Sequence, residues 1–419
     1  MNSQVSGFYK LSPKERLDKV AAEAGLTDEE KETIAKAVLP MEQADHMIEN
    51  VVGEMPIPLG IAVNFQINGE DKFVPMAIEE PSVVAAASFS AKLARVKGGF
   101  TTESSDPVMI GQIQLVNVPD PEGAIVQVEA RANELVEKAN SFDPVLVKFG
   151  GGAKSIEAKV IDTITGKMVI CHLLVDCRDA MGANAVNTMA EGIAPMLEEI
   201  TGGEVRLRII SNLAVHRVSR ARAVWDKEAL GGEEVVDRII DAYAFAAADQ
   251  YRCATHNKGI MNGASAVVLA TGNDSRAVEA GAHSYAARNG RYEPLTKYEK
   301  DADGNLVGSI EMPTAVGLVG GATKTHPVAR ANVRILGVKT AQELGQVVVA
   351  VGLAQNLAAL RALANEGIQR GHMGLHARNI AIIAGAEGDL ADKVAAQMVK
   401  EKKVRVDRAQ EILAELKKQ

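Results

Sequence analysis

Apolar and polar residues alternate in short runs through the middle of the chain. These runs are residues 108–118, 155–162, 168–175 and 205–210. A period of two residues predicts half-buried β-strands. Two stretches with helical spacing separate the runs: residues 120–139, and residues 179–200, which Gly202 ends. The order β-α-β-β-α-β is ferredoxin-like, so we predict that residues 108–212 form an inserted domain with its own core.

The N-terminal part of the chain carries helix caps and a hairpin signal. Ser12-Pro13-Lys14-Glu15 is a capping box with proline at the first helical position, and Thr27 with Glu30 repeats the pattern. We therefore predict two short helices before residue 40. The apolar run 61–67 predicts a strand, and the dipeptide Asn68-Gly69 predicts the tight turn of a β-hairpin.

Helical spacing returns in the C-terminal half. Residues 235–248 and 340–366 are rich in alanine and glycine, which suits a closely packed central helix of a larger domain. The end of the chain is charged and helical over residues 394–417. A histidine-bearing segment, residues 369–373, precedes it, so we expect a mobile C-terminal cap that carries a catalytic group.

Composition narrows the class of protein. A length of 419 residues predicts two or three domains. The net charge of −8 argues against a nucleic-acid binder, which needs a concentrated basic surface. The longest apolar run, residues 347–353, is too short to cross a bilayer, and the N-terminus lacks the pattern of a signal peptide. Three cysteines, Cys171, Cys177 and Cys253, form no CxxC pair, so we expect a reduced, cytoplasmic protein.

Residues 255–263 are the segment with the clearest chemical content. They place Lys258 beside a histidine, an amide and glycines, without helical or strand periodicity, and we predict a loop there. A lysine in such a loop suits the polarisation of a carbonyl oxygen. The alternative interpretation of residues 255–263 is a surface loop whose lysine is solvated.

Three further segments of this kind complete an acid–base set. They are residues 78–82, 270–274 and 369–373. Together with Lys258 they offer a carboxylic acid, a second carboxylate and a histidine, which is what reduction of a carbonyl and loss of a leaving group require. The pair Glu79 and Glu80 has two interpretations: an ordinary charged strand end, or an acid held at the edge of a dry pocket before Pro81.

No G-x-G-x-x-G motif follows a predicted strand, which argues against an ordinary Rossmann site. The glycines of residues 317–321 have the wrong spacing. Residues 179–184 are the better dinucleotide candidate, because they join a strand to a helix N-terminus whose free amides suit a pyrophosphate. Gly150-Gly151-Gly152 would let a ligand approach the backbone, although each of these segments could also be a packing turn.

Metal and hydrolase chemistry have weaker support. His372 and His376 are four residues apart, but no glutamate follows the first histidine and no third ligand is evident, so we predict no metal site. His256 and His326 receive no role. The absence of Ser-x-x-Lys and Gly-x-Ser-x-Gly motifs argues against a serine hydrolase.

Several of these segments, in this order, resemble one known family. They are Glu49-Asn50-Val51-Val52-Gly53, residues 79–85, 179–184, 255–263 and 272–274, Gly320-Gly321-Ala322-Thr323, and Gly371-His372-Met373. Together they resemble the motifs of 3-hydroxy-3-methylglutaryl-CoA reductase, and in particular the soluble bacterial class II enzymes. The resemblance implies reduction of hydroxymethylglutaryl-CoA to mevalonate and CoA with two hydride equivalents, through a mevaldyl-CoA thiohemiacetal and mevaldehyde.

The same resemblance implies an α+β architecture. A large substrate domain, residues 1–107 and 213–366, would surround a central helix. The inserted residues 108–212 would form a non-Rossmann nicotinamide domain, and residues 367–419 a C-terminal flap. A homodimer with active sites at the subunit interface is also implied.

The family's catalytic roles are carried over residue by residue. Glu80 matches the proton donor to the carbonyl oxygen, and Lys258 the residue that polarises this oxygen. Asp274 matches the aspartate that sets the lysine's charge state, and His372 the histidine that protonates the departing thiolate.

The family's binding residues follow in the same way. Ser82, Arg252 and Asn262 match substrate-binding residues, with Arg252 on the substrate carboxylate. The expected cofactor-binding residues are Lys154, Ser155, Asp179, Met181, Gly182, Asn184 and Asn212.

One departure concerns the cofactor. NADH-preferring relatives carry an aspartate at the place of Ser155, whereas this chain has serine next to Lys154. A carboxylate repels a 2′-phosphate, and a cation attracts it. We therefore expect NADPH, with NADH as the alternative.

Two other functions compete with a reductase. A catalytically silent CoA- or nucleotide-binding protein would have lost one of Glu80, Lys258, Asp274 or His372, and all four are present. A CoA-dependent lyase would need a metal or a nucleophilic cysteine, for which the sequence has no good candidate set.

Overall fold

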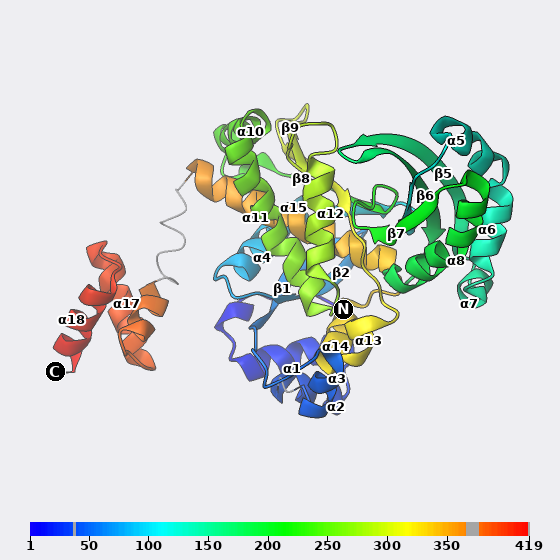
Figure 1. Ribbon diagram of the computed structural model, residues 1–419. Coiled ribbons are helices and arrows are strands. Elements are labelled where there is room, and N and C mark those ends of the chain that lie inside the picture. Colours follow the sequence, from blue (N-terminus) through cyan, green and yellow to red (C-terminus); the bar gives the residue numbers. More distant parts are fainter. Residues whose placement is uncertain (37–38, 366–376, 418–419) are drawn as a thin grey trace.

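The computed structural model describes residues 1–36, 39–365 and 377–417. Its strands form two sheets, one of six strands in the order β2-β1-β3-β8-β10-β9 and one of four in the order β5-β6-β4-β7 (Figure 1). Each sheet has its own apolar core, and the C-terminal helices enclose another. The α+β fold that the sequence predicts is confirmed.

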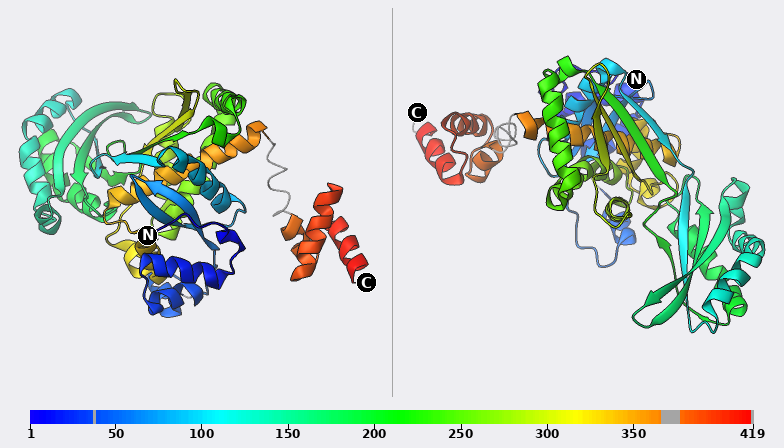
Figure 2. Two further views of the ribbon diagram at one scale, coloured as in Figure 1. Left: turned by 180° about the vertical axis from the view of Figure 1, so that it is seen from behind. Right: turned by 90° about the horizontal axis from the view of Figure 1, so that it is seen from above.

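The four-stranded sheet belongs to the inserted segment. Its strands are β4 (Val108–Val116), β5 (Gly152–Thr163), β6 (Gly166–Asp176) and β7 (Glu204–Ser211). Its helices are α5 (Pro121–Ala130), α6 (Ala132–Asn140), α7 (Pro144–Lys148) and α8 (Ala183–Thr201). Neighbouring strands are antiparallel, and α5, α6 and α8 cover one face of the sheet (Figure 2). The predicted β-α-β-β-α-β order is confirmed.

Two helix boundaries in this segment differ from the prediction. The helix expected over 120–139 breaks at Arg131, whose φ is −105° and ψ 15°. The residue pattern does not explain this break, since the buried Val128 and Leu135 would share a face of one continuous helix. The helix expected from Asp179 begins only at Ala183, because the preceding residues are hydrogen-bonded to another part of the chain.

The six-stranded sheet and the surrounding helices form the large part of the molecule. Its strands are β1 (Leu59–Ile67), β2 (Glu70–Ala77), β3 (Phe100–Ser104), β8 (Val218–Trp225), β9 (Thr296–Lys300) and β10 (Leu306–Pro313). The helices are η1 (Phe8–Lys10), α1 (Pro13–Ala24), α2 (Asp28–Lys36), α3 (Met41–Met47), α4 (Val83–Ala94), η2 (Arg95–Lys97), α9 (Lys227–Leu230), α10 (Glu233–Ala248), α11 (Gln250–Ala270), α12 (Ser275–Ala286), α13 (Gly321–Thr325), α14 (Pro327–Leu336) and α15 (Ala341–Asn365).

Helix α15 passes through the middle of this part, between α4, α10 and α11 and the strands β3, β8 and β10 (Figure 2). It is long and apolar enough to cross a bilayer by length and composition, but 72% of the apolar window is buried in the structure. The predicted central helix is confirmed.

The predicted loop at residues 255–263 is wrong: these residues lie inside helix α11. The glycines that suggested a loop serve helix packing. A Cβ on Gly263 would lie 2.9 Å from the Gln355 Cβ, and a Cβ on Gly352 would lie 3.1 Å from the Ile260 Cγ2. Glycine therefore lets α11 and α15 approach closely, and burial outweighs its low helix propensity.

The capping box and the hairpin turn predicted near the N-terminus are confirmed. Ser12 Oγ accepts a hydrogen bond from the Glu15 amide at 3.3 Å, and Glu15 Oε2 accepts one from the Ser12 amide at 2.7 Å. The turn between β1 and β2 has positive φ at Asn68 (50°) and Gly69 (82°), as a type I′ hairpin requires.

The C-terminal helices α17 (Asp389–Glu401) and α18 (Val406–Leu416) pack on one another and stand apart from the large sheet (Figures 1 and 2). The stretch predicted as helical over 394–417 is thus two helices, separated at Lys402, where φ is 55°. His372 and His376 lie outside the described residues.

Candidate active site

Glu80, Lys258 and Asn262 meet at one carboxylate oxygen. The Lys258 Nζ lies 2.8 Å from the Glu80 Oε2, and the Asn262 Nδ2 donates to the same oxygen at 3.3 Å. Lys258 and Asn262 are one helical turn apart on α11, and Glu80 lies in the turn between β2 and α4. The lysine side chain is 62% exposed and the glutamate 37%, so both can reach a ligand. A carboxyl group and an ammonium group are therefore adjacent and accessible at this point.

Ser82 lies beside this group in a strained conformation. Its φ is 74° and its ψ −15°, and as N-cap of α4 its hydroxyl makes no capping hydrogen bond. A left-handed conformation at a residue other than glycine costs of order 1–3 kcal/mol and is concentrated at functional sites. The structure thus brings Ser82 to Glu80 with its hydroxyl uncommitted to the helix.

Arg252 lies on the first turn of α11, two turns before Lys258. Burial lowers the pKa of its guanidinium. Within the described residues the guanidinium forms no ion pair or hydrogen bond, and only the Arg252 amide is engaged, by Asp249. An arginine of this kind is available to a carboxylate ligand.

Asp274 does not join this group within one chain. It follows the C-terminal end of α11 and caps α12, where its Oδ1 accepts the amides of Arg276 at 3.0 Å and Ala277 at 3.1 Å. From Lys258 to the end of α11 the helix rises about 18 Å at roughly 1.5 Å per residue. Lys258 lies near the middle of α11, so about 18 Å of helix separates it from the end that leads to Asp274.

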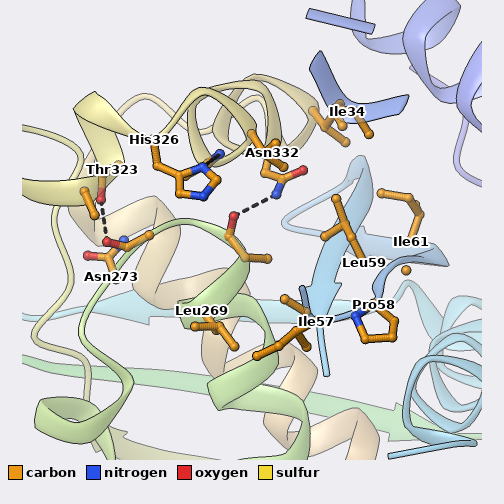
Figure 3. A pocket seen from close by; sticks show the side chains of 18 of the residues that line it. Ile34, Ile57, Pro58, Leu59, Ile61, Leu269, Asn273, Thr323, His326 and Asn332 are labelled. Carbon is orange, nitrogen blue, oxygen red and sulfur yellow. Dashed lines mark hydrogen bonds between the residues drawn. The ribbon is translucent and has the colours of Figure 1, made fainter. Parts of the chain in front are cut away.

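Asp274 instead lines a cavity together with residues 180–184 of the predicted cofactor segment (residues 179–184). A cavity of about 2900 Å³ is lined by Asp274, Met181, Gly182 and Asn184, among others. Figure 3 shows its other wall, where Leu269, Asn273, His326 and Asn332 surround the space near Ile57. The second carboxylate and the cofactor segment thus line the same cavity.

Close packing requires glycine at position 182 of the cofactor segment. Gly182 has φ 109°, and a Cβ there would lie 2.4 Å from the Cys177 Sγ. It is the N-cap of α8, without a side-chain capping bond, so the first amides of the helix stay available to an anion. Asp179 has a structural partner that the sequence did not indicate: its Oδ1 accepts the Ala341 amide at the start of α15, at 2.8 Å. Asn212 is exposed directly after β7.

Lys154 lies at the start of β5, beside Ser155. A second cation, Arg178, which the sequence did not indicate, lies near it. The Lys154 Nζ lies 3.2 Å from the Gly150 carbonyl and 3.9 Å from the Asp176 carboxylate. The Arg178 Nη2 contacts the same two acceptors at 2.8 and 2.6 Å. Two exposed cations thus surround one buried carboxylate, leaving a net positive charge at the glycine turn.

The two histidines without an assigned role have structural partners. His326 caps α14 through its Nδ1, which accepts the Ala329 amide at 3.4 Å. His256 is buried, and its Nε2 lies 2.6 Å from the Thr296 Oγ1. Because Thr296 donates its own proton to Asn356 at 3.0 Å, His256 must donate through Nε2 and keep Nδ1 unprotonated.

His256 should make the fold sensitive to acid. Burial lowers its pKa from 6.5 to about 3. Between these values the unfolded chain binds a proton that the folded chain does not, so stability falls as the pH drops below about 6.5. At pH 5 we expect His256 to lower the free energy of unfolding by about 2 kcal/mol. His256→Gln should remove that dependence in denaturant melts at pH 7 and 5, whereas the exposed His216→Gln should keep it. Equal pH dependence in all three proteins would contradict the assignment.

Among residues 1–36, 39–365 and 377–417, no group of three His, Cys, Asp or Glu side chains is placed to hold a metal ion. Cys171, Cys177 and Cys253 are free and buried. Burial raises the pKa of Cys171 and Cys177 to about 12, which leaves these thiols poor nucleophiles.

Comparison with known proteins gives these residues a context. A sequence model of the hydroxymethylglutaryl-coenzyme A reductase family matches residues 12–377. The 3-hydroxy-3-methylglutaryl-coenzyme A reductase of Archaeoglobus fulgidus is 62% identical over 417 residues, covering 100% of this chain and 95% of that protein. The probable enzyme of that name from Borreliella burgdorferi is 35% identical over 355 residues, covering 83% of this chain and 80% of its own.

Solved structures agree with the sequences. The class II 3-hydroxy-3-methylglutaryl-CoA reductase of Streptococcus pneumoniae, bound to NADPH in open conformations, superposes with a TM-score of 0.83 at 38% identity, over 97% of this chain and 100% of that chain. Another structure of the Streptococcus pneumoniae reductase gives a TM-score of 0.84 at 39% identity, over 98% of this chain and 99% of that one. The chain therefore belongs to the hydroxymethylglutaryl-coenzyme A reductase family.

Proposed function

We propose that the protein reduces hydroxymethylglutaryl-CoA to mevalonate and free CoA with two equivalents of NADPH, in the cytoplasm. The observation that carries this proposal is the contact of the Lys258 Nζ with the Glu80 Oε2 at 2.8 Å, shared by Asn262. A thioester carbonyl in contact with Lys258 would have its developing oxyanion stabilised by the ammonium. Glu80 is then the acid within reach of that oxygen.

Other residues of this chain bind and orient the substrate. Arg252, whose guanidinium has no acidic partner among the described residues, would hold the substrate carboxylate. Ser82 and Asn262 flank the acid and supply neutral hydrogen bonds. His372 would protonate the departing thiolate, which makes CoA a better leaving group.

The residues of the inserted sheet fit a nicotinamide dinucleotide, which when bound supplies hydride. The uncapped N-terminus of α8 offers backbone amides to a pyrophosphate. Lys154 and Arg178 add positive charge at the neighbouring glycine turn. A catalytically silent binding protein has less support, because Glu80 and Lys258 are in contact rather than dispersed.

We further propose a homodimer in which a second copy completes the site. Within one chain the C-terminal half of α11, about 18 Å long, separates Asp274 from Lys258, so an aspartate near the lysine would have to come from another subunit. Helix α11 carries an exposed stripe along one side, with Tyr251 89% and Leu269 41% exposed. Val52 (99%) and Met55 (85%) expose further apolar surface on the segment before β1. Exposed apolar surface of this extent suits a subunit interface.

The activity is tested by absorbance of the reduced cofactor. We expect loss of NADPH absorbance that depends on added hydroxymethylglutaryl-CoA, with two cofactors consumed per CoA released. Light scattering of the same sample should give a dimer. Substrate-independent oxidation, or none with either cofactor, would refute the proposal.

The charge beside Ser155 predicts the cofactor preference. Lys154 and Arg178 leave the glycine turn positive, so we expect kcat/KM for NADPH to exceed that for NADH by roughly tenfold or more. Ser155→Asp should erode the preference by repelling the 2′-phosphate. Thr165→Asp adds the same charge at the far end of the β5–β6 hairpin and should leave it unchanged. A wild-type preference for NADH would show that Ser155 does not face the 2′ position.

A further inference from the structure

Arg217 is a buried arginine that the mechanism above does not use. It precedes β8, where the chain returns to the large sheet, and is only 4% exposed. Its Nη1 donates to the carbonyls of Ala180 at 2.9 Å and Met181 at 3.1 Å, and its Nη2 to that of Val316 at 2.6 Å. These acceptors belong to two segments far apart in sequence. The guanidinium therefore joins the cofactor segment to the residues that follow β10.

The same two segments touch along their backbones. The Asp179 carbonyl accepts the amides of Leu318 at 2.8 Å and Val319 at 3.2 Å. A Cβ added to Gly317 would lie 2.5 Å from the Met181 nitrogen, which leaves no room for a side chain between the segments. Ala180 and Val319 also form an isolated parallel bridge. The cofactor segment is thus fixed to the large part of the molecule as well as to its own sheet.

The contact continues to the candidate catalytic aspartate. The Gly317 amide donates to the Asn273 Oδ1 at 2.7 Å, and Asn273 is the residue before Asp274. Asn273 is therefore hydrogen-bonded to Gly317, and the preceding residue, Val316, is hydrogen-bonded to Arg217. Arg217 in turn donates to the carbonyl of Met181, which completes the connection. Glu80 and Lys258 take no part in it.

Among the described residues, no carboxylate forms an ion pair with Arg217, and the guanidinium donates to three main-chain carbonyls instead. Arginine suits this role because its planar fork presents several donors in fixed directions. Lysine carries the same charge on a single ammonium and cannot reproduce the fork that spans both segments.

We propose that Arg217 is a positioning residue that holds the cofactor segment, residues 179–184, in register with the Asp274 loop. The proposal rests on the proposed function, since it assigns residues 179–184 to the dinucleotide. Without the fork, the carbonyls of Ala180 and Met181 lose their partner and the segment separates from Val316. The amides at the start of α8 then leave the place where they bind the pyrophosphate.

The test separates cofactor binding from substrate binding. In Arg217→Lys we expect the KM for NADPH to rise about tenfold, with the KM for hydroxymethylglutaryl-CoA changed less than about threefold. Direct titration of NADPH by its fluorescence, without substrate, should show the same loss of affinity. Gly317→Ala should reproduce it with Arg217 intact, because the new methyl group pushes the segments apart.

Arg361→Lys is the matched control. Arg361 also donates to a main-chain carbonyl, that of Leu230 at 3.1 Å, but at the other end of the large sheet. This variant should lose thermal stability without the selective rise in the NADPH constant. If Arg217→Lys and Gly317→Ala lower only the melting temperature, or raise both Michaelis constants equally, Arg217 has no positioning role. A wild type that lacks substrate-dependent oxidation refutes the proposed function instead, and the fluorescence titration still decides the role of Arg217.

Discussion

Lys258→Ala is expected to lower kcat by about 10²-fold or more, the scale of one oxyanion-stabilising donor. In the structure Lys258 is the cation that contacts Glu80, at 2.8 Å. The fold should survive, because the lysine side chain is 62% exposed and exposed ion pairs contribute only about 0–1 kcal/mol to stability. Steady-state turnover and thermal melting of the same preparation measure both effects.

Lys297→Ala provides the matched control for this result. Lys297 is 66% exposed and ion-paired with Glu299 at 2.9 Å, but it lies on β9. Its loss should leave kcat within about twofold, as for a surface substitution away from the site. Near-normal turnover in Lys258→Ala would exclude the lysine from stabilising the oxyanion.

His372→Gln should separate the two reductions. If the histidine protonates the thiolate, the variant loses about 10²-fold or more in reduction of the thioester, the usual range for one general acid. Reduction of free mevaldehyde expels no thiolate, so its rate should change far less. Parallel assays with hydroxymethylglutaryl-CoA and with mevaldehyde give this ratio directly.

His283→Gln controls for the loss of a histidine as such. His283 Nδ1 lies 2.7 Å from the Tyr292 hydroxyl, which is a structural contact on α12. Both reductions should remain near the wild-type rate in this variant. If His372→Gln slows both reductions equally, the histidine has another role than protonation of the leaving group.

The sequence by itself determined the features whose signals are local. The inserted sheet could be predicted because each of its strands buries one face, and alternation records that burial along the chain. The capping box at Ser12 and the turn at Asn68 were equally readable, because their hydrogen bonds and backbone angles involve neighbouring residues. Glu80, Lys258, Asp274 and His372 were predicted from residue types and motifs, which carry no information on their arrangement in space.

Only the tertiary structure decided that Lys258 lies on a helix. Helix α11 is buried on most sides, so its apolar residues show little one-sided pattern, and Gly263 resembles a loop glycine until Val351 and Gln355 are seen against it. Burial against α15 stabilises this helix, and that energy depends on residues about ninety positions away.

The grouping of the site residues is likewise a property of the folded chain. Lys258 and Asp274 are near in sequence, yet the C-terminal half of α11 separates them, whereas Glu80 reaches Lys258 from the turn between β2 and α4. No sequence pattern near Arg217 or Val316 predicted their contact. The guanidinium binds carbonyls from two segments that are distant in sequence. Sequence specifies which groups are available, and the packing of α11, α15 and residues 316–319 fixes which of them can act together.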